Sequence, residues 1–282
     1  MSGFVDALVA HEFLQRSLAA GLLAALAAGI VGPYVVVRRI SVIAGAIAHA
    51  VLGGIGAARW LHEVHGWTAL RPVHGALAAA LLAALAVALI SRHFREREDT
   101  LIAAVWAFGM ALGVLFVSRT PGYARDLMSD LFGNVLLVQP SDLWLMAGLD
   151  AVVLAVALVW HRQIVATCFD PEFARLRGIN TELVHLLLLL LAAVTVVLLA
   201  LVVGIVLVIA LLTIPAAIAG RLTRTLGGMM ALAVLVSAGL TSAGLAVSYG
   251  PDLPTGATTI VLAVALYGLV LAGGGLRRLV RG

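Results

Sequence analysis

The sequence contains no lysine, a single cysteine and few charged residues. All 18 basic residues are arginine, and charged residues make up 11% of the 282 positions. The lone cysteine, Cys168, excludes an intrachain disulfide and a multi-cysteine zinc site. Hydrophobic residues make up 63% of the chain, and the mean hydropathy is +1.13. This composition predicts an all-α, polytopic bundle of transmembrane helices. The net charge of +4 then indicates membrane orientation and not nucleic-acid binding.

Apolar runs long enough to cross a bilayer recur along the whole chain. Windows of about 20 residues predict nine spans, the seventh of them short: 14–37, 41–61, 73–91, 101–118, 143–160, 183–203, 204–219, 226–248 and 256–276. Residues 183–219 form one apolar stretch interrupted only by Gly204 and Pro215, so eight spans are the alternative. The piece from Leu127 to Val138 is too short to cross and is interpreted as a re-entrant or surface helix.

The arginines predict the orientation of these spans. An N-terminus outside places 13 of the 18 arginines in the cytoplasm and five outside, which satisfies the positive-inside rule. The C-terminus is then cytoplasmic. No loop is long enough for a soluble domain, so we expect a single transmembrane domain over residues 1–282 with no nucleotide-binding module of its own.

One ionisable residue lies deep inside a predicted span. His49 follows Arg39 by ten residues, and no charged residue lies between Arg39 and Arg59. At about 1.5 Å of rise per residue, His49 is about 15 Å deep, halfway through a hydrocarbon layer of ~30 Å. Ionisable groups at this depth belong to transport pathways or to buried polar networks. His49 is therefore either a ligand on a transport path or a neutral histidine satisfied by backbone or water.

The longest predicted cytoplasmic segment, residues 162–182, carries the end signals of a short helix. Asp170 suits the N-cap, Pro171 suits the first position, and Glu172 favours the positive end of the helix dipole. Gly178 suits a left-handed position after the last turn. The helix is too polar to enter lipid. We expect it on the cytoplasmic face, either as a docking element for a partner or as a surface helix between two spans.

A series of motifs along the chain is similar to that of a transporter family. It begins with Arg38-Arg39-Ile40-Ser41 and His49-Ala50-Val51-Leu52. The later motifs are Asp99-Thr100, Asp126-Leu127, Leu131-Phe132-Gly133-Asn134, Asp170 with Ala174 and Gly178, Val203-Gly204, Ile214-Pro215-Ala216-Ala217 and Asp252-Leu253-Pro254-Thr255-Gly256-Ala257. In this order and spacing they resemble the permeases of ATP-binding-cassette importers for zinc, manganese or iron, the ABC-3 family.

This resemblance implies a type II importer-like permease that moves divalent metal ions, zinc or manganese, across the bacterial cytoplasmic (inner) membrane. It implies three kinds of partner: a second copy of the chain, two copies of a cytoplasmic ATPase, and an extracytoplasmic metal-binding protein. ATP is then hydrolysed on the partner, and the chain is neither an enzyme nor the holder of a permanent cofactor. Contact with the ATPase falls on the coupling segment 162–182, at Asp170, Glu172, Ala174, Arg175 and Gly178.

The sequence departs from the family pattern one helical turn before the histidine. The resemblance implies a carboxylate there that joins the histidine in a transient metal site, since residues at i and i+4 share a helix face. This chain has Gly45 at that position. We expect the missing ligands from His49 of a second protomer first, and otherwise from Asp126, Asp130 or water. One imidazole nitrogen suits zinc and is less distinctive for manganese.

Three other residues are candidates for auxiliary roles on the metal path. Asp150 lies about 12 Å along its helix from Asp142, where an unpaired charge costs several kcal/mol, and we favour a structural polar contact for it. His62 and His65 lie in the predicted outer loop. They either collect metal at the outer mouth or are simply solvated.

Two alternative functions also fit the sequence. The absence of a carboxylate at position 45 also fits a permease for a chelated metal such as siderophore iron or cobalamin, which needs a wide, inert cavity. An intramembrane enzyme is the alternative of a different class. Only His49 and Asp150 offer it ionisable groups inside the spans, and no nucleophile accompanies them.

Overall fold

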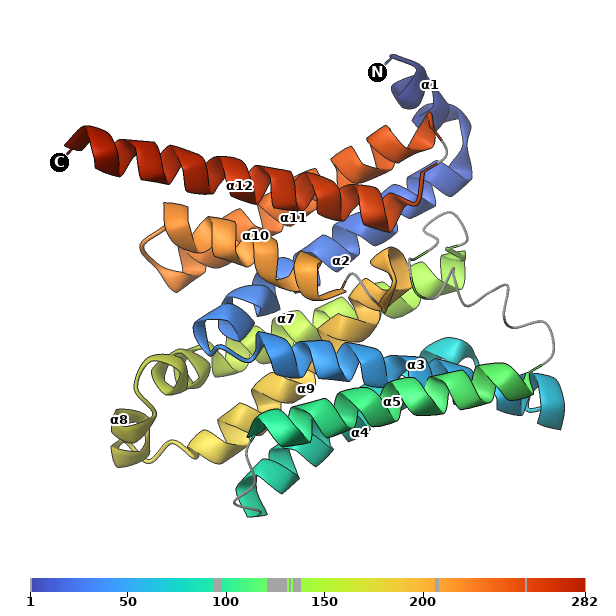
Figure 1. The fold of residues 1–282 in the computed structure, drawn as a ribbon, viewed down its shortest axis with the longest axis horizontal. Coiled ribbons are helices and arrows are strands. Elements are labelled where there is room, and N and C mark those ends of the chain that lie inside the picture. The colour runs from blue at the N-terminus through green and yellow to red at the C-terminus, as the bar shows by residue number, and fades with distance from the viewer. Residues whose placement is uncertain are drawn as a thin grey trace.

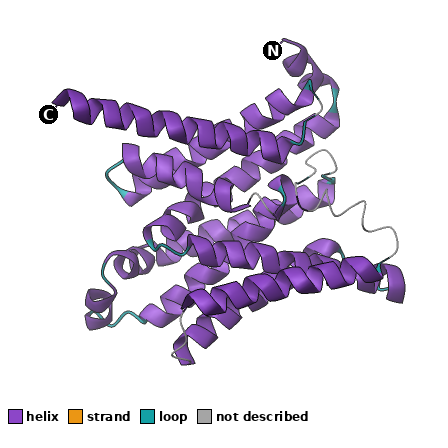
Figure 2. Ribbon diagram, in the orientation of Figure 1, coloured by secondary structure: helices purple, strands orange, loops and turns teal. Residues whose placement is uncertain are grey.

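The computed structural model describes residues 2–93, 98–120, 131, 133, 138–205, 208–251 and 253–281. Within this part of the chain, every regular element is a helix (Figure 2). In chain order the helices are α1 (Ser2–Ala10), α2 (Glu12–Val37), α3 (Ser41–His65), α4 (Pro72–His93), α5 (Glu98–Arg119), α7 (Pro140–Phe169), α8 (Pro171–Leu176), α9 (Thr181–Val203), α10 (Val208–Leu222), α11 (Leu226–Tyr249) and α12 (Thr255–Arg281). The prediction of an all-α helical bundle is confirmed.

Eight of the described helices are long and apolar enough to cross a membrane: α2, α3, α4, α5, α7, α9, α11 and α12. The apolar stretch 183–219 is divided in two, as the sequence allowed. α9 ends at Val203, and Gly204 follows with a φ of 85°, a left-handed conformation that favours glycine. The second part, α10, has 15 residues and is about 22 Å long. It is shorter than a hydrocarbon layer of ~30 Å.

Two groups of helices make up the bundle (Figure 1). In one group, α3 packs against α4 and α5. In the other, α2 packs against α7 and α11, while α10 packs against α2, α11 and α12. α9 contacts both groups, through α4 and α3 on one side and α2 and α7 on the other. In Figure 1, α8 and the C-terminus lie at the left of the view and the N-terminus lies toward the right.

Glycines bring α3 and α4 into backbone contact. A Cβ atom on Gly54 would overlap the carbonyl oxygen of Gly75, and a Cβ on Gly75 would overlap the carbonyl oxygen of Gly54. Small residues allow such close approach between helices in lipid, where dispersion contacts drive association. The crossing of α3 and α4 therefore has no room for a side chain at either position.

We expect Gly54→Val to destabilise the protein by about 1–3 kcal/mol, the usual range for overpacking, because the new side chain has to separate two backbones. The measurement is thermal unfolding of the purified protein in detergent, followed by size-exclusion chromatography. Gly148→Val on α7 is the matched control, since a Cβ there meets nothing within 4 Å. Equal losses of folded protein in both variants would contradict this account of the crossing.

Candidate metal site

His49 lies within α3 and packs against an aromatic ring of α5. Its side chain is buried, with 9% of the residue exposed. The imidazole stacks on the indole of Trp106, with ring centroids 4.2 Å apart and an angle of 20° between the planes. Both residues lie eight positions from the start of their helices, so they are at the same level in the bundle. The indole thus covers one face of the imidazole.

Gly45 lies one turn before His49, on the same face of α3. A Cβ at this position would lie 2.5 Å from Cδ1 and 3.1 Å from Cγ1 of Ile209, and 3.7 Å from Cζ3 of Trp106. Ile209 belongs to the first turn of α10, which packs on α3. The face of α3 that carries Gly45 and His49 is therefore turned toward α5 and α10.

The acidic residues considered for the metal path lie only partly within the described structure. Asp126 and Asp130 lie outside the described residues. Asp150 lies on a different helix from His49, α7, and α9 contacts both α7 and α3. Among the described residues, no group of three or more histidine, cysteine, aspartate and glutamate side chains is placed to hold a metal ion.

Asp150 is buried without a hydrogen-bond partner among the described residues. It is 4% exposed, and neither carboxylate oxygen accepts or donates a hydrogen bond there. It lies on the same face of α7 as the buried residues Met146, Val153 and Ala157. The structural polar contact that the sequence favoured for Asp150 is not formed within the described residues.

His62 and His65, predicted in an outer loop, lie in the last turn of a helix and make separate contacts. His62 and His65 lie in the last turn of α3, which ends at Gly66 in the left-handed conformation. His62 Nε2 is 4.0 Å from Oε1 of Glu63, while the ring of His65 meets Trp60 edge-on at 4.4 Å. Neither histidine shares its contacts with the other.

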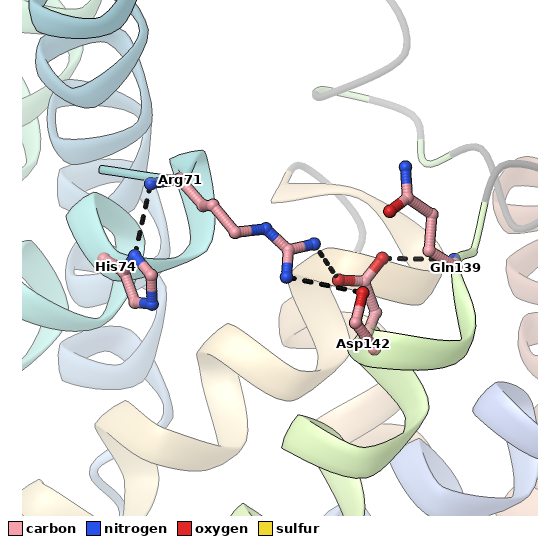
Figure 3. A network of polar contacts seen from close by, with 5 residues as sticks. Arg71, His74, Gln139 and Asp142 are labelled. Atoms are coloured by element: carbon pink, nitrogen blue, oxygen red, sulfur yellow. Dashed lines mark hydrogen bonds and ion pairs between the residues drawn. The ribbon is translucent and has the colours of Figure 1, made fainter. Parts of the chain in front are cut away.

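A polar network missed by sequence reasoning joins the loop after α3 to the start of α7 (Figure 3). The Arg71 guanidinium donates to Oδ1 of Asp142 at 2.5 Å and to Oγ of Ser141 at 3.4 Å. The other oxygen of Asp142 accepts from the backbone N–H of Gln139 at 3.1 Å and so caps α7. His74 Nδ1 accepts from the backbone N–H of Arg71 at 3.2 Å.

The Arg71–Asp142 pair borders a cavity of about 310 Å³ between α3, α4, α7 and α9. Its charged lining consists, within the described residues, of Arg59, Arg71 and Asp142. Among the described residues, the charged groups of this cavity are thus two guanidinium groups and one carboxylate, and Arg71 is paired with Asp142.

The capped helix expected in segment 162–182 is present as α8. The Asp170 side chain accepts from the backbone N–H of Phe173 at 2.9 Å, and Pro171 occupies the first turn. Gly178 follows the helix with a φ of 80°. Arg175 donates from Nε to Oγ1 of Thr181 at 2.8 Å, which holds α8 against the start of α9.

One side of α8 anchors the helix and the other exposes apolar side chains. Ala174 is fully buried. Phe173 and Leu176 are exposed by 50% and 87%, and Phe169, at the end of α7, is exposed by 66%. A short helix with charged ends and exposed large apolar residues has the character of a protein-binding surface.

The motif order, the helical bundle and the capped α8 correspond to one known family. Over residues 10–273 the sequence matches the ABC 3 transport family. The chain belongs to this ABC-3 family. The resemblance drawn from the motifs is thereby confirmed, and the chain is a transporter permease subunit.

Similar ABC-3 proteins cover nearly the full chain. An uncharacterised membrane protein of Synechocystis is 40% identical over 93% of this chain and 91% of its own length. The manganese transport system membrane protein MntC of Halalkalibacterium halodurans is 33% identical over 94% of this chain and 89% of its own. Among solved structures, PsaBC from Streptococcus pneumoniae in complex with Fab has a TM-score of 0.85 at 29% identity, covering 95% of this chain and 94% of that chain.

Two side chains that meet the Gly45–His49 face of α3 in this ABC-3 permease were also missed from the sequence. Trp106 gave a usable signal, because tryptophan in membrane spans is enriched at the interfaces, and Trp106 lies inside a span. Ile209 gave none, since an isoleucine in an apolar run is ordinary. Only the packing of α10 on α3 brings it to Gly45.

Proposed function

We propose that this chain is the permease subunit of an ATP-binding-cassette importer that moves divalent transition metal ions, zinc or manganese, across the bacterial cytoplasmic membrane. The observation that carries the substrate class is the likeness to the manganese permease MntC over 94% of the chain. A buried imidazole inside a membrane span supports it, since ionisable groups at such depth mark transport paths. ATP is hydrolysed by a separate subunit.

His49 is the metal-binding residue of this proposal. A neutral imidazole is a good zinc ligand, and the described residues contain no group of three or more histidine, cysteine, aspartate and glutamate side chains that could hold the ion without it. We infer that two copies of the chain pair so that His49 of each protomer faces the path of the ion, with water completing the coordination. Asp126 and Asp130 are the further candidates for ligands.

The cytoplasmic ATPase docks on α8 in this proposal, one ATPase copy for each of two permease copies. The support is the combination of a buried anchor at Ala174, charged residues at Glu172 and Arg175, and exposed apolar residues at Phe173 and Leu176. An extracytoplasmic metal-binding protein delivers the ion at the opposite face. With α8 in the cytoplasm, the N-terminus is outside and the C-terminus is inside, in agreement with the arginine distribution.

The test is uptake by reconstituted vesicles that contain the permease, its ATPase and its binding protein. We expect ATP-dependent accumulation of zinc or manganese, and no accumulation when the permease is left out. Siderophore-bound iron and cobalamin serve as competing substrates. Uptake of a chelate without uptake of any free ion would overturn the proposal in favour of a chelate permease.

A further inference from the structure

Another cavity lies beside α8, at the end of the bundle that carries this helix. It has a volume of about 480 Å³ and is bordered by the turn after α2, the C-terminal part of α4, α8 and the start of α9. α9 packs against both α4 and α8. In Figure 1, α8 and the start of α9 lie at the lower left of the view, on the side where α4 ends. Four segments that are far apart in the sequence thus enclose one space.

Two arginines from separate segments line this cavity. Arg38 follows the last residue of α2 and is half-buried, while Arg175 lies in the last turn of α8. Nε of Arg175 donates to Oγ1 of the buried Thr181 at 2.8 Å, which fixes the position of the guanidinium. Glu182 and His185, both near the start of α9, border the same cavity. Guanidinium groups bind phosphate through paired donors, so two of them in one cavity provide a site for a phosphate group.

The other side of the cavity is apolar and continues onto a stripe of leucines. Leu89 of α4 and Leu183 of α9 line the cavity and are exposed. Leu85 and Leu82 are also exposed and lie on the same face of α4 as Leu89. Because α4 is long and apolar enough to cross a membrane, this stripe runs about 10 Å along the hydrocarbon layer. A polar cavity at the end of an apolar stripe matches the two parts of a phospholipid.

We propose that this cavity binds the headgroup of an anionic phospholipid, with an acyl chain along the leucines of α4. The phosphate lies between Arg38 and Arg175, and the carboxylate of Glu182 accepts a hydrogen bond from a hydroxyl of a glycerol headgroup. Basic pockets between spans on the cytoplasmic side bind anionic headgroups in this way. The inference rests on the proposed function, which places α8 in the cytoplasm. Since Arg175 belongs to α8, the lipid holds the helix on which the ATPase docks.

The experiment measures the lipid retained by the purified full-length permease in detergent, by native mass spectrometry. Phosphatidylglycerol and phosphatidylcholine with identical acyl chains are offered together, and we expect wild type to retain phosphatidylglycerol in preference. Arg38→Gln should weaken this retention about fivefold, because one arginine near an anionic lipid contributes about 1 kcal/mol. The double variant Arg38→Gln/Arg175→Gln should lose the preference. Arg224→Gln is the matched control, since Arg224 is an exposed arginine after α10 and lies outside the cavity lining.

Two further arms separate the lipid from other anions. Inorganic phosphate should not displace phosphatidylglycerol, because it has no acyl chain to lie on α4, and displacement would indicate a site for free phosphate. Co-purification of the ATPase is measured with the same variants. If Arg38→Gln lost the ATPase and kept the lipid, the cavity would be a socket for an acidic side chain of that partner.

The outcomes on wild type and the control also decide the proposal. Equal retention of the two lipids by wild type, a wild-type preference in the double variant, or an equal loss in Arg224→Gln would each overturn it. Failure of the proposed function has a different signature, namely no uptake of metal by vesicles with all subunits. Lipid retention is measured without the ATPase, the binding protein or metal, so the two failures are distinguishable.

Discussion

Replacing Leu176 with aspartate should abolish ATP-dependent metal uptake while leaving the permease folded. Leu176 is the most exposed large apolar residue of the described chain, at 87%, and it ends a helix that lies outside the membrane spans. A charge in the centre of an apolar docking surface has to be desolvated when the partner binds, and removal of a central contact of this kind costs about 2 kcal/mol or more. Since the side chain is exposed, the free energy of unfolding should change by less than about 0.5 kcal/mol.

The readouts for Leu176→Asp are co-purification of the ATPase and uptake by reconstituted vesicles, both of which should fall to background. Leu222→Asp is the matched control, because Leu222 ends α10 and is exposed by 61%. Charge reversal at Glu172 together with Arg175 should also uncouple ATP hydrolysis from uptake. Normal uptake by Leu176→Asp would mean that α8 is only a surface connection between α7 and α9.

Replacing His49 with alanine should lower uptake to about a tenth of wild type or less, the loss of at least 1.4 kcal/mol of binding to the transported ion. Alanine also removes the ring that stacks on Trp106. His49→Phe separates the two effects, because phenylalanine keeps a ring in the stack and provides no nitrogen for the metal. We expect both variants to lose uptake, and His49→Phe to keep more of the wild-type thermal stability.

The control for these variants is His11→Phe, a substitution of the same kind at an exposed histidine near the N-terminus. It should transport at the wild-type rate. If His49→Phe also did so, His49 would be a packing residue, and the ion would take a path that avoids it.

The spans and the capped helix α8 were predictable because their signals are local. A run of apolar residues has to satisfy its own backbone in lipid and therefore forms a helix. Asp170, Pro171 and Gly178 act on neighbouring backbone groups within a few residues, and α8 has the expected cap. The break at Gly204 was visible for the same reason, since a positive φ at that residue depends on its own lack of a side chain.

The surroundings of His49 were not predictable, because they depend on contacts between helices far apart in the chain. Sequence spacing places Gly45 and His49 on one face of α3, but nothing in it tells which side chains that face meets. Trp106 and Ile209 reach it from α5 and α10, and both are apolar residues in apolar runs. The pairing of Arg71 with Asp142 was not predictable for the same reason, since the two residues are 71 positions apart in the sequence.

The glycine contacts of α3 have a mechanical consequence. Gly54 touches the backbone of α4, and a Cβ on Gly109 of α5 would overlap the backbone of Ala50, so these three helices have no compressible layer of side chains between them at these crossings. We expect α3, α4 and α5 to move as one rigid unit, in which Trp106 stays stacked on His49. α10 meets that unit through the flexible side chain of Ile209, and it begins just beyond Gly204. We therefore expect the helices to separate, during transport, at the contact between α10 and this unit.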